Sequence, residues 1–365
     1  MRVLILTIDA FGGRGGEAQF SRDIITSFSR HQDVTEIVAL VRSVSRPIET
    51  LPPKLNYDLS GLGGKNKFIL AVLKIILTRR FDLIYCGHVN LLQMAWLAAL
   101  LNRVPLILAV YGIEIWQPHP SWLVRALLNR VDVVLAISEF TKKKMASWAL
   151  NMGEEKYRIF PCTVDPSHFG EGPKDPTLLA RYGLKPADKL ILILCCLRSV
   201  ERHKGLDPLL EVMPMLQQRD SSIKLMIAGD GDDRQRLEEK ANKLGVTRHV
   251  IFAGYVADEE KAAHYRLADA FVMPSHGEGF GIVFLEAMAC GVPVVSGDGD
   301  GSREIMIRFG DQGQAVDPKN LKNLEKAILI ALQTPHGVSP GLDYFLFPEF
   351  ENRFNDLIDE LVGSV

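Results

Sequence analysis

The sequence predicts an α/β protein built from two Rossmann-like domains, and three observations carry this prediction. The chain has 365 residues, of which 47% are hydrophobic, so it can form two separate cores. Short apolar runs alternate with stretches of helical periodicity in both halves, which is typical of parallel sheets built from β-α-β units. A segment rich in Pro and Gly at 161–186 interrupts this alternation, as an inter-domain linker does.

The first half starts with a buried strand at 3–7, because a short apolar run precedes Asp9. Further strands are expected at 36–41, 83–86, 106–110 and 133–137. Helices are expected between them, at 18–30, 68–79, 91–101 and 139–149. Together these elements form one Rossmann-like unit, which we assign to residues 1–168.

The second half repeats the pattern after the linker. Strands are expected at 190–195, 224–229, 250–253, 270–273 and 292–296. Helices are expected at 206–217, 234–243, 259–267, 282–289 and 322–332. This second unit spans residues 169–346, and the tail at 349–361 has helical apolar spacing, so it predicts a final amphipathic helix. With two such units, ligands are expected in the cleft between them, at the carboxyl ends of the strands.

Charge and composition exclude several classes of protein. The net charge of −2 and the pI of about 6.5 argue against a protein that wraps nucleic acid. The charge is uneven, however, with 20 basic and 14 acidic residues over 1–168 against 22 and 30 over 169–365. No apolar stretch reaches the roughly 18 residues of a membrane span, and the apolar start is too short for a secretory signal. The five cysteines lack metal-type spacing, so a reduced, cytoplasmic protein is expected.

A Gly-rich turn follows the first strand, with Gly12, Gly13, Gly15 and Gly16 ahead of a helix. Such a turn lets backbone N–H groups approach an anion at the helix N-terminus. The spacing is neither the dinucleotide-binding fingerprint nor a P-loop. Contact with phosphate or substrate and a plain tight turn therefore both stay open.

Two carboxylates eight residues apart give the strongest signal. Glu278 lies in a Gly-rich loop, and Glu286 lies in the apolar helix that follows it. A glutamate flanked by apolar residues in a helix is costly to bury unless its carboxylate accepts hydrogen bonds, for which sugar hydroxyls are suitable donors. The helix N-terminus near Gly281 and Ile282 can bind phosphate. The alternative for Glu286 is a cap on a neighbouring helix.

The run from Pro274 to Val295, which contains both glutamates, resembles the Glu-x7-Glu signature of retaining GT-B glycosyltransferases of family 4 (glycosyl transferases group 1), mannosyltransferases among them. Weaker matches follow in the family's order over most of the chain. They are Gly15-Gly16, 228–231, 252–256, 300–304 and Asp317-Pro318. The resemblance implies the GT-B fold, with a C-terminal helix, here 347–365, that returns to the N-terminal domain.

The resemblance also implies roles for individual residues. Glu278 would hold hydroxyls of the donor sugar, Glu286 the ribose hydroxyls, and Lys204 the diphosphate, while the backbone around Tyr255 would read the base. The full set of donor-binding residues is Gly16, Arg198, Lys204, Tyr255, Glu278, Gly279, Phe280, Gly281, Ile282 and Glu286. We expect Glu278, Lys204 and Arg198 to be the catalytic residues.

A second cation beside Lys204 is expected, because charge develops on the diphosphate as the glycosidic bond breaks. The family's arginine follows the strand directly, but Cys196 occupies that place here. Either Arg198 takes the role or the second cation is absent, and we favour Arg198. Arg202 is expected to be a solvated loop charge.

Four residues of the first half are expected on the acceptor side: Gly15, His88, Tyr111 and Glu114. Tyr111 precedes Gly112 where many relatives carry His, and a tyrosine is a poor base at neutral pH. The departing phosphate would then deprotonate the acceptor. For Glu114, a hydrogen bond to Ser138 or to a helix N-terminus is the structural alternative, and His88 at a strand end has a structural alternative as well.

The segment 65–80 combines basic residues with bulky apolar ones. One interpretation is a Rossmann helix with a buried face and solvated lysines. The other is attachment to anionic lipid at the inner face of the plasma membrane, and Lys142, Lys143 and Lys144 add cations to the same domain.

The resemblance thus implies a cytoplasmic enzyme that moves a hexose, mannose being one candidate, from a GDP- or UDP-sugar to a hydroxyl of a glycan, a lipid-linked acceptor or a small molecule. No metal or other cofactor and no nucleic acid is implied, and Asp298-Gly299-Asp300 is expected to be a polar loop rather than a metal-ligand pair. Two alternatives stay open: a nucleotide-sugar epimerase, and a non-catalytic nucleotide-sugar-binding partner of another transferase.

Overall fold

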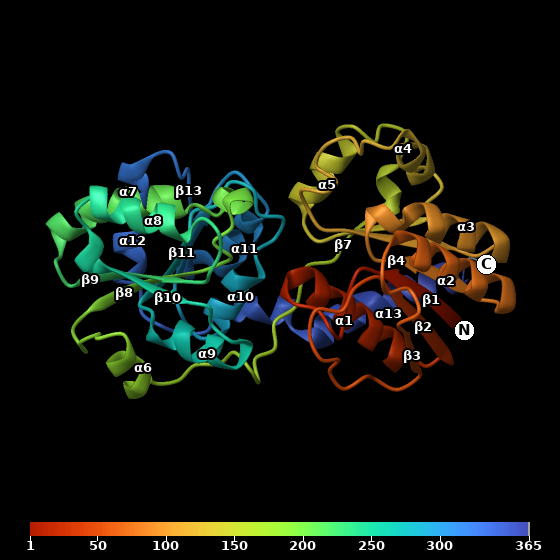
Figure 1. The fold of residues 1–365 in the computed structure, drawn as a ribbon, viewed down its shortest axis with the longest axis horizontal. Helices are drawn as coiled ribbons and strands as arrows, with labels where there is room; N and C mark the ends of the chain where they lie inside the picture. The colour runs from red at the N-terminus through yellow and green to blue at the C-terminus, as the bar shows by residue number, and fades with distance from the viewer. Residues whose placement is uncertain (364–365) are drawn as a thin grey trace. The chain divides into compact units, whose positions relative to one another are not determined.

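The computed structural model describes residues 1–363 and divides the chain into two compact units (Figure 1). The first comprises Met1–Thr163 together with the segment from Phe347 onward, and the second comprises Val164–Leu346. The sequence had indicated a first junction at 168/169 instead, so the five residues 164–168 go with the second unit. Residues 364–365 of the predicted returning segment lie outside the described residues. The predicted cleft between the units stays a prediction.

The first unit contains a seven-stranded parallel sheet with the order β3-β2-β1-β4-β5-β6-β7. Its strands are β1 (Arg2–Thr7), β2 (Glu36–Val41), β3 (Leu55–Asp58), β4 (Leu83–Cys86), β5 (Leu106–Val110), β6 (Val133–Ala136) and β7 (Tyr157–Ile159). The chain builds outward from β1 on one side through β2 and on the other through β4. Such a reversal of strand order leaves a crevice at the carboxyl ends of the two central strands, here β1 and β4.

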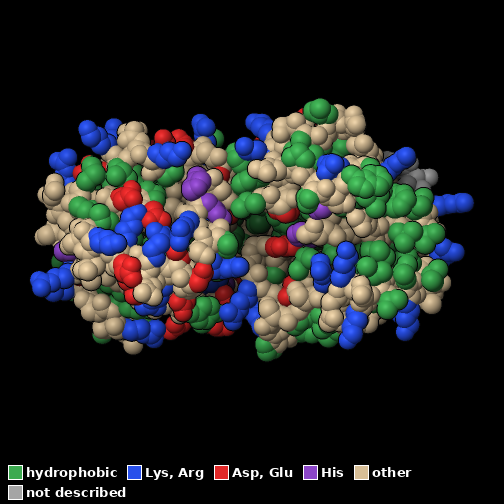
Figure 2. Space-filling model, turned by 45° about the horizontal axis from the view of Figure 1, so that its top comes forward, with side chains coloured by type: hydrophobic (Ala, Val, Ile, Leu, Met, Phe, Trp, Pro, Cys, Tyr) green, Lys and Arg blue, Asp and Glu red, His purple; other side chains and the backbone are tan. Residues whose placement is uncertain are grey.

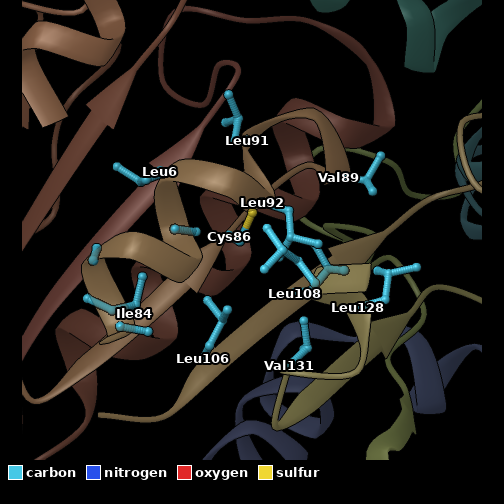
Figure 3. Packing of buried hydrophobic residues seen from close by; sticks show 14 of the residues in the cluster. Leu6, Ile84, Cys86, Val89, Leu91, Leu92, Leu106, Leu108, Leu128 and Val131 are labelled. Atoms are coloured by element: carbon cyan, nitrogen blue, oxygen red, sulfur yellow. The ribbon is translucent and has the colours of Figure 1, made fainter. Parts of the chain in front are cut away.

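Helices cover both faces of this sheet (Figure 1). They are α1 (Gly15–Arg30), α2 (Lys65–Thr78), α3 (Leu92–Asn102), α4 (Trp122–Leu128) and α5 (Glu139–Ala146). Strand side chains such as Leu6, Ile84 and Leu108 gather with Leu92 of α3 and Leu128 of α4 in one buried cluster (Figure 3). Because the central strands of the sheet are covered on both faces, they are mostly apolar, which is why the sequence predicted them.

The last helix, α13 (Phe347–Gly363), packs on α1 of the first unit (Figure 1). Phe350 and Phe354 are fully buried, and the ring centroids of Phe354 and Phe28 are 4.6 Å apart. Arg30 and Arg158 of the first unit pair with acidic residues of α13. The predicted return of the C-terminal helix to the first domain is therefore observed, and it is stabilised by both apolar burial and opposite charge.

The second unit contains a six-stranded parallel sheet with the order β10-β9-β8-β11-β12-β13. Its strands are β8 (Lys189–Leu194), β9 (Ile223–Ala228), β10 (Val250–Gly254), β11 (Ala270–Met273), β12 (Val294–Gly297) and β13 (Gly313–Val316). Its helices are α6 (Pro176–Arg181), α7 (Leu206–Arg219), α8 (Arg234–Lys243), α9 (Asp258–Leu267), α10 (Ile282–Ala289), α11 (Ser302–Phe309) and α12 (Leu321–Ala331). Here the strand order reverses at β8, which has β9 on one side and β11 on the other.

Two Rossmann-like sheets and a returning helix confirm the predicted fold class. The sequence missed the strands β3, β7 and β13 and the helices α4, α6 and α11. Helix α6 lies inside the segment 161–186 that was expected to be a linker. Among the described residues, no helix has the length and apolar character needed to cross a bilayer.

Candidate functional site

The loops that follow β8 and β11 lie side by side, because these two strands pair in the sheet. The first loop contains the short helix η3 (Ser199–Lys204) and leads into α7 through Gly205, which has a φ of +86°. A side chain at Gly205 would meet the carbonyl oxygen of Pro274 in the second loop at 2.2 Å. The amide of His276 donates to the carbonyl of His203 over 2.9 Å. Glycine is therefore required where the two loops touch.

This adjacency brings together two of the predicted catalytic residues. The Lys204 ammonium forms an ion pair with Oε2 of Glu278, and both side chains are largely buried. Burial acts to lower the pKa of Lys204, but the Glu278 carboxylate outweighs it and holds the pKa above its ordinary value. The sequence predicted that both residues belong to the site. The fold brings them into contact although they are 74 residues apart in the chain.

Asp300, in the loop between β12 and α11, holds the Glu278 loop in place. Its Oδ2 accepts hydrogen bonds from the Glu278 amide at 2.9 Å and from the Ser275 hydroxyl at 2.7 Å. Its Oδ1 accepts from the amide of Ser302 at 3.0 Å. A buried carboxylate with these partners acts as an anchor for the loop, in line with the polar-loop interpretation of 298–300.

Glu286 lies in α10 and is buried, as the sequence predicted for a carboxylate that accepts hydrogen bonds. Its Oε2 accepts a hydrogen bond of 2.7 Å from the Tyr265 hydroxyl. Burial raises the pKa of Glu286, while the nearby Lys261 ammonium and the Tyr265 hydrogen bond oppose this rise. The partner that the structure gives Glu286 is thus a tyrosine on α9.

Arg202 lies in η3 and Arg198 is its N-cap residue, and the two arginines have different surroundings. Nη2 of Arg202 lies 2.6 Å from Oδ1 of the buried Asp233, while 53% of the Arg202 side chain is exposed, so this solvated charge also has a structural partner. Arg198 is exposed, and its nearest carboxylate, that of Glu201, lies 3.6 Å away. Cys196, which occupies the place of the family's arginine, is exposed. Arg198 is therefore better placed than Arg202 to meet a ligand.

The other predicted donor residues are distributed as follows. Gly279, Phe280, Gly281 and Ile282 continue the Glu278 loop into α10, and Phe280 is buried against Phe345. Tyr255 follows β10 and is exposed. Gly16 belongs to α1 of the first unit, so its contact with a donor held by the second unit stays a prediction.

In the first unit, the predicted acceptor-side residues lie at the carboxyl edge of the sheet. Gly15 begins α1, His88 follows β4, and Tyr111 and Glu114 follow β5. Glu114 accepts hydrogen bonds from the amides of Tyr111 at 2.6 Å and Gly112 at 3.0 Å. These partners replace both alternatives considered for Glu114, Ser138 and a helix N-terminus. His88 caps η1 (Val89–Leu91) by accepting from the Asn90 amide at 3.0 Å.

The structure adds one carboxylate to this edge that the sequence analysis missed. Glu17 lies in the first turn of α1, directly after the Gly-rich turn. Burial raises its pKa to about 7, and the negative charges of Glu114 and Asp9 add to the rise. Its position directly after Gly15-Gly16 could have marked Glu17 as a candidate site residue. Its partial burial could not be predicted, because it depends on the tertiary fold.

One group of potential metal ligands occurs among residues 1–363, made of His31, Asp33 and Asp359 at the contact of α1 with α13. His31 accepts a hydrogen bond from the Asp33 amide at 3.3 Å and lies 3.4 Å from the Asp359 carboxylate. The two carboxylates are exposed. The group thus ties α13 to α1 and lies outside the two sheet edges described above.

Comparison with known proteins identifies both units. Residues 16–168 match the family Glycosyltransferase Family 4, and residues 184–338 match Glycosyl transferases group 1. A GDP-mannose-dependent alpha-(1-6)-phosphatidylinositol monomannoside mannosyltransferase of Mycolicibacterium smegmatis is 33% identical over 241 residues, which are 63% of this chain and 61% of the relative. The alpha-monoglucosyldiacylglycerol synthase of Streptococcus pneumoniae is 29% identical over 51% of this chain and 42% of its own. The match thus spans about three fifths of the length of the mannosyltransferase.

Solved structures show the same fold over the whole chain. The sucrose-phosphate synthase of Thermosynechococcus elongatus superposes with a TM-score of 0.77 at 18% identity, covering 100% of both chains. Anabaena HepE in complex with UDP-glucose has a TM-score of 0.74 at 20% identity, covering 99% of this chain and 100% of its own. The two family matches, which jointly cover more than four fifths of the chain, show that the protein belongs to the family 4 glycosyltransferases, with a group 1 glycosyltransferase domain as its second unit.

Proposed function

We propose that the protein is a retaining glycosyltransferase that moves a hexose from a nucleotide diphosphate sugar to a hydroxyl of an acceptor. The observation that carries this proposal is the Lys204–Glu278 ion pair at the carboxyl edge of the second sheet. It presents one cation and one hydrogen-bond acceptor within a few ångströms of each other, which suits a ligand with a diphosphate next to a sugar ring.

Each predicted donor residue has a task in this proposal. Lys204 and Arg198 bind the diphosphate and stabilise the charge that develops as it leaves, and the N-terminus of α10 adds a favourable partial charge. Glu278 accepts hydrogen bonds from the sugar and Glu286 from the ribose. The backbone around Tyr255 reads the base.

The chemical step breaks the bond between the anomeric carbon and the diphosphate oxygen and forms a bond from that carbon to the acceptor oxygen. The acceptor proton passes to the departing diphosphate. Burial raises the pKa of Tyr111 well above its ordinary value, so this tyrosine does not act as the base at neutral pH. Tyr111, Glu114, His88 and Gly15 instead form the acceptor side.

The relatives favour a GDP-mannose donor and a glycolipid acceptor. The mannosyltransferase of Mycolicibacterium smegmatis uses GDP-mannose, as its name states, and HepE was solved with UDP-glucose. Because the mannosyltransferase is the more similar in sequence, we propose mannose as the sugar, with transfer in the cytoplasm.

A peripheral membrane contact forms part of the proposal. On its exposed side, α2 carries Lys67, Leu70, Lys74 and Leu77 at helical spacing, with Leu70 66% and Leu77 76% exposed. The helix contains no acidic residue. Figure 2 shows hydrophobic and basic side chains next to one another on the surface of the first unit. Lysines beside exposed leucines suit the surface of an anionic bilayer.

A panel of GDP- and UDP-sugars tests the proposal. Thermal shifts identify the donor, because a bound ligand stabilises the folded state. Product analysis with and without a glycolipid acceptor then separates transfer, hydrolysis and epimerisation. Lys204→Ala and Glu278→Gln are each expected to lower turnover roughly a hundredfold. Unchanged turnover in both variants, or an epimerised sugar as the product, would refute the proposal.

A further inference from the structure

One buried carboxylate oxygen at the carboxyl edge of the first sheet, Oε1 of Glu17, has no hydrogen-bond partner among the described residues. The hydroxyls of Tyr85 and Tyr111 lie near it and interact with one another, and Ser21 lies beside Tyr111. Tyr85 is fully buried on β4, Tyr111 follows β5, and the two rings and Glu17 lie close enough to affect one another's pKa. Native proteins rarely leave a buried carboxylate oxygen unpaired, and a ligand is one reason for it.

The neighbouring carboxylates differ from Glu17 in that the backbone satisfies them. Glu114 accepts from the amides of Tyr111 and Gly112, and Asp9 accepts from the amide of Ala10 at 2.7 Å. Only Glu17, of these three, keeps a buried oxygen free for another donor. This oxygen can accept a hydrogen bond from one ligand hydroxyl, and because a carboxylate accepts at both oxygens, a vicinal hydroxyl of the same ligand can bind the other.

The charged groups around Glu17 determine whether this site suits a neutral or a charged ligand. The carboxylates of Asp9 and Glu114 face it from the loops after β1 and β5, and Tyr85 and Tyr111 face it from β4 and from the end of β5. Of the cations nearby, Arg22 acts on Asp9 and donates to the carbonyl of Ala10 at 2.9 Å. His88 lies near Glu114, and Arg42 and His119 act on His88. The residues that act on Glu17 directly are thus negative or neutral, although residues 1–163 carry 20 basic against 13 acidic side chains.

We propose that Glu17 binds the acceptor by accepting hydrogen bonds from hydroxyl groups of a neutral polyol ring, with the Tyr111 hydroxyl as the second contact. This inference rests on the proposed glycosyl transfer and deepens it. It names Glu17 as a specificity residue and uncharged sugar or cyclitol rings as the acceptor end. A phosphate group attached to that ring must point away from Glu17, because the carboxylates there repel it.

The test compares Glu17→Gln with Glu155→Gln, which removes an exposed carboxylate of the same unit. Methyl α-mannoside and myo-inositol serve as neutral acceptors, and mannose 6-phosphate serves as the charged one. Glu17→Gln is expected to raise the KM for the neutral acceptors about tenfold, because a charged hydrogen-bond acceptor is lost. Donor hydrolysis without acceptor stays at the wild-type rate, as does every parameter of Glu155→Gln. Mannose 6-phosphate is expected to be at least tenfold poorer than methyl α-mannoside.

A pH series separates a binding role from a structural one. With a pKa of about 7, Glu17 is ionised above neutral pH, so the wild-type acceptor KM is expected to fall between pH 6 and pH 8. In Glu17→Gln this dependence disappears. The variant is also expected to unfold at the same or a higher temperature at pH 8, since it no longer buries a charge. Glu17→Asp provides a second variant, with an intermediate KM.

Three outcomes would overturn the inference. An unchanged acceptor KM in Glu17→Gln, alongside normal transfer by the wild type, overturns it while leaving the proposed function intact. A Gln variant that loses stability at pH 8 and keeps its acceptor KM assigns Glu17 a structural role and also overturns it. If the wild type moves no sugar from any donor, the proposed function fails first and the inference fails with it.

Discussion

The Tyr265 hydroxyl donates a hydrogen bond of 2.7 Å to Oε2 of Glu286, and both residues are buried between α9 and α10. Burial alone would favour the protonated, neutral form of Glu286, whereas this hydrogen bond and the Lys261 ammonium favour the carboxylate. A carboxylate accepts hydrogen bonds at both oxygens. Tyr265 thus helps to keep Glu286 in the form that the proposed contact with ribose needs.

Replacing Tyr265 by Phe leaves Oε2 of Glu286 buried without this donor. We expect the free energy of unfolding to fall by about 1–3 kcal/mol, the range for an unsatisfied buried acceptor. Urea unfolding at pH 7 measures the change. Tyr182→Phe provides the comparison, because the Tyr182 hydroxyl contacts a ring nitrogen of the buried His264 at 2.9 Å rather than a carboxylate. An equal loss of unfolding free energy in the two variants would show that the hydrogen bond to Glu286 stabilises the fold no more than the one to His264 does.

Substitution of Arg198 is expected to affect donor binding, whereas substitution of Arg202 is expected to affect stability. Arg198→Ala should weaken donor binding about tenfold, because it removes a charge-assisted contact to the diphosphate. Arg202→Ala should leave donor affinity within about twofold but lower the free energy of unfolding by roughly 1–3 kcal/mol, since it takes one partner from buried Asp233. Calorimetric titration and urea unfolding of both variants provide the two numbers. The reverse assignment of effects would make Arg202 the second cation of the donor site.

Asp233 predicts a pH dependence of stability. The hydrogen bonds from Arg236, opposed in part by burial and supported by Arg202, lower its pKa from 3.8 to about 2. Because the folded state has the lower pKa, the ionised carboxylate stabilises it above pH 3.8, and this contribution is lost as the pH falls towards 2. Its size is about 1–2 kcal/mol.

Asp233→Asn measures this contribution. The variant should be less stable than the wild type at pH 7, and the difference should shrink as the pH is lowered from 4 to 2.5. Asp298→Asn, which changes an exposed carboxylate, serves as the control. A difference that is constant with pH would show that the loss comes from geometry rather than from charge.

The returning helix should be an integral part of the first unit. Phe354→Ala removes a fully buried ring that packs 4.6 Å from the ring of Phe28, so the free energy of unfolding should fall by about 3–5 kcal/mol. Circular dichroism during urea unfolding measures it. Leu123→Ala, at a partly exposed place on α4, should cost less than about 1 kcal/mol. A small effect of Phe354→Ala would mean that α13 adds little to the unit.

The exposed side of α2 should bind anionic membranes. Lys67→Glu with Lys74→Glu should abolish most binding to vesicles that contain 30% phosphatidylserine, because each basic residue near the surface contributes about 1 kcal/mol. Leu70→Ser with Leu77→Ser should weaken binding at high salt as well, since that loss is apolar. Co-sedimentation measures both.

A charge-matched control comes from the second unit, where Lys322 and Lys326 are exposed lysines four residues apart on α12. Reversing both to Glu should leave vesicle binding unchanged. If the α12 and α2 reversals reduce binding equally, net charge rather than α2 governs the interaction. If neither reduces it, the membrane contact is absent.

Much of the fold could be predicted because the central strands are buried on both faces and therefore apolar throughout, as in β5 and β8. The missed strands β3, β7 and β13 lie at the sheet edges, where exposure allows mixed residues such as the Leu-Asn-Tyr-Asp of β3. The missed helices α4 and α6 have only 7 and 6 residues, too few for a clear period.

The sequence by itself determined the family and the two-domain plan, and it singled out Lys204, Glu278 and Glu286 as candidate site residues, because these depend on local patterns and on a motif with fixed spacing. Only the tertiary structure decided which of these groups meet. Lys204 reaches Glu278 because β8 pairs with β11. Arg202 pairs with Asp233, and the half-buried Glu17 lies among carboxylates and tyrosines. Partners and burial depend on strand order and packing between distant segments, and no local pattern encodes either.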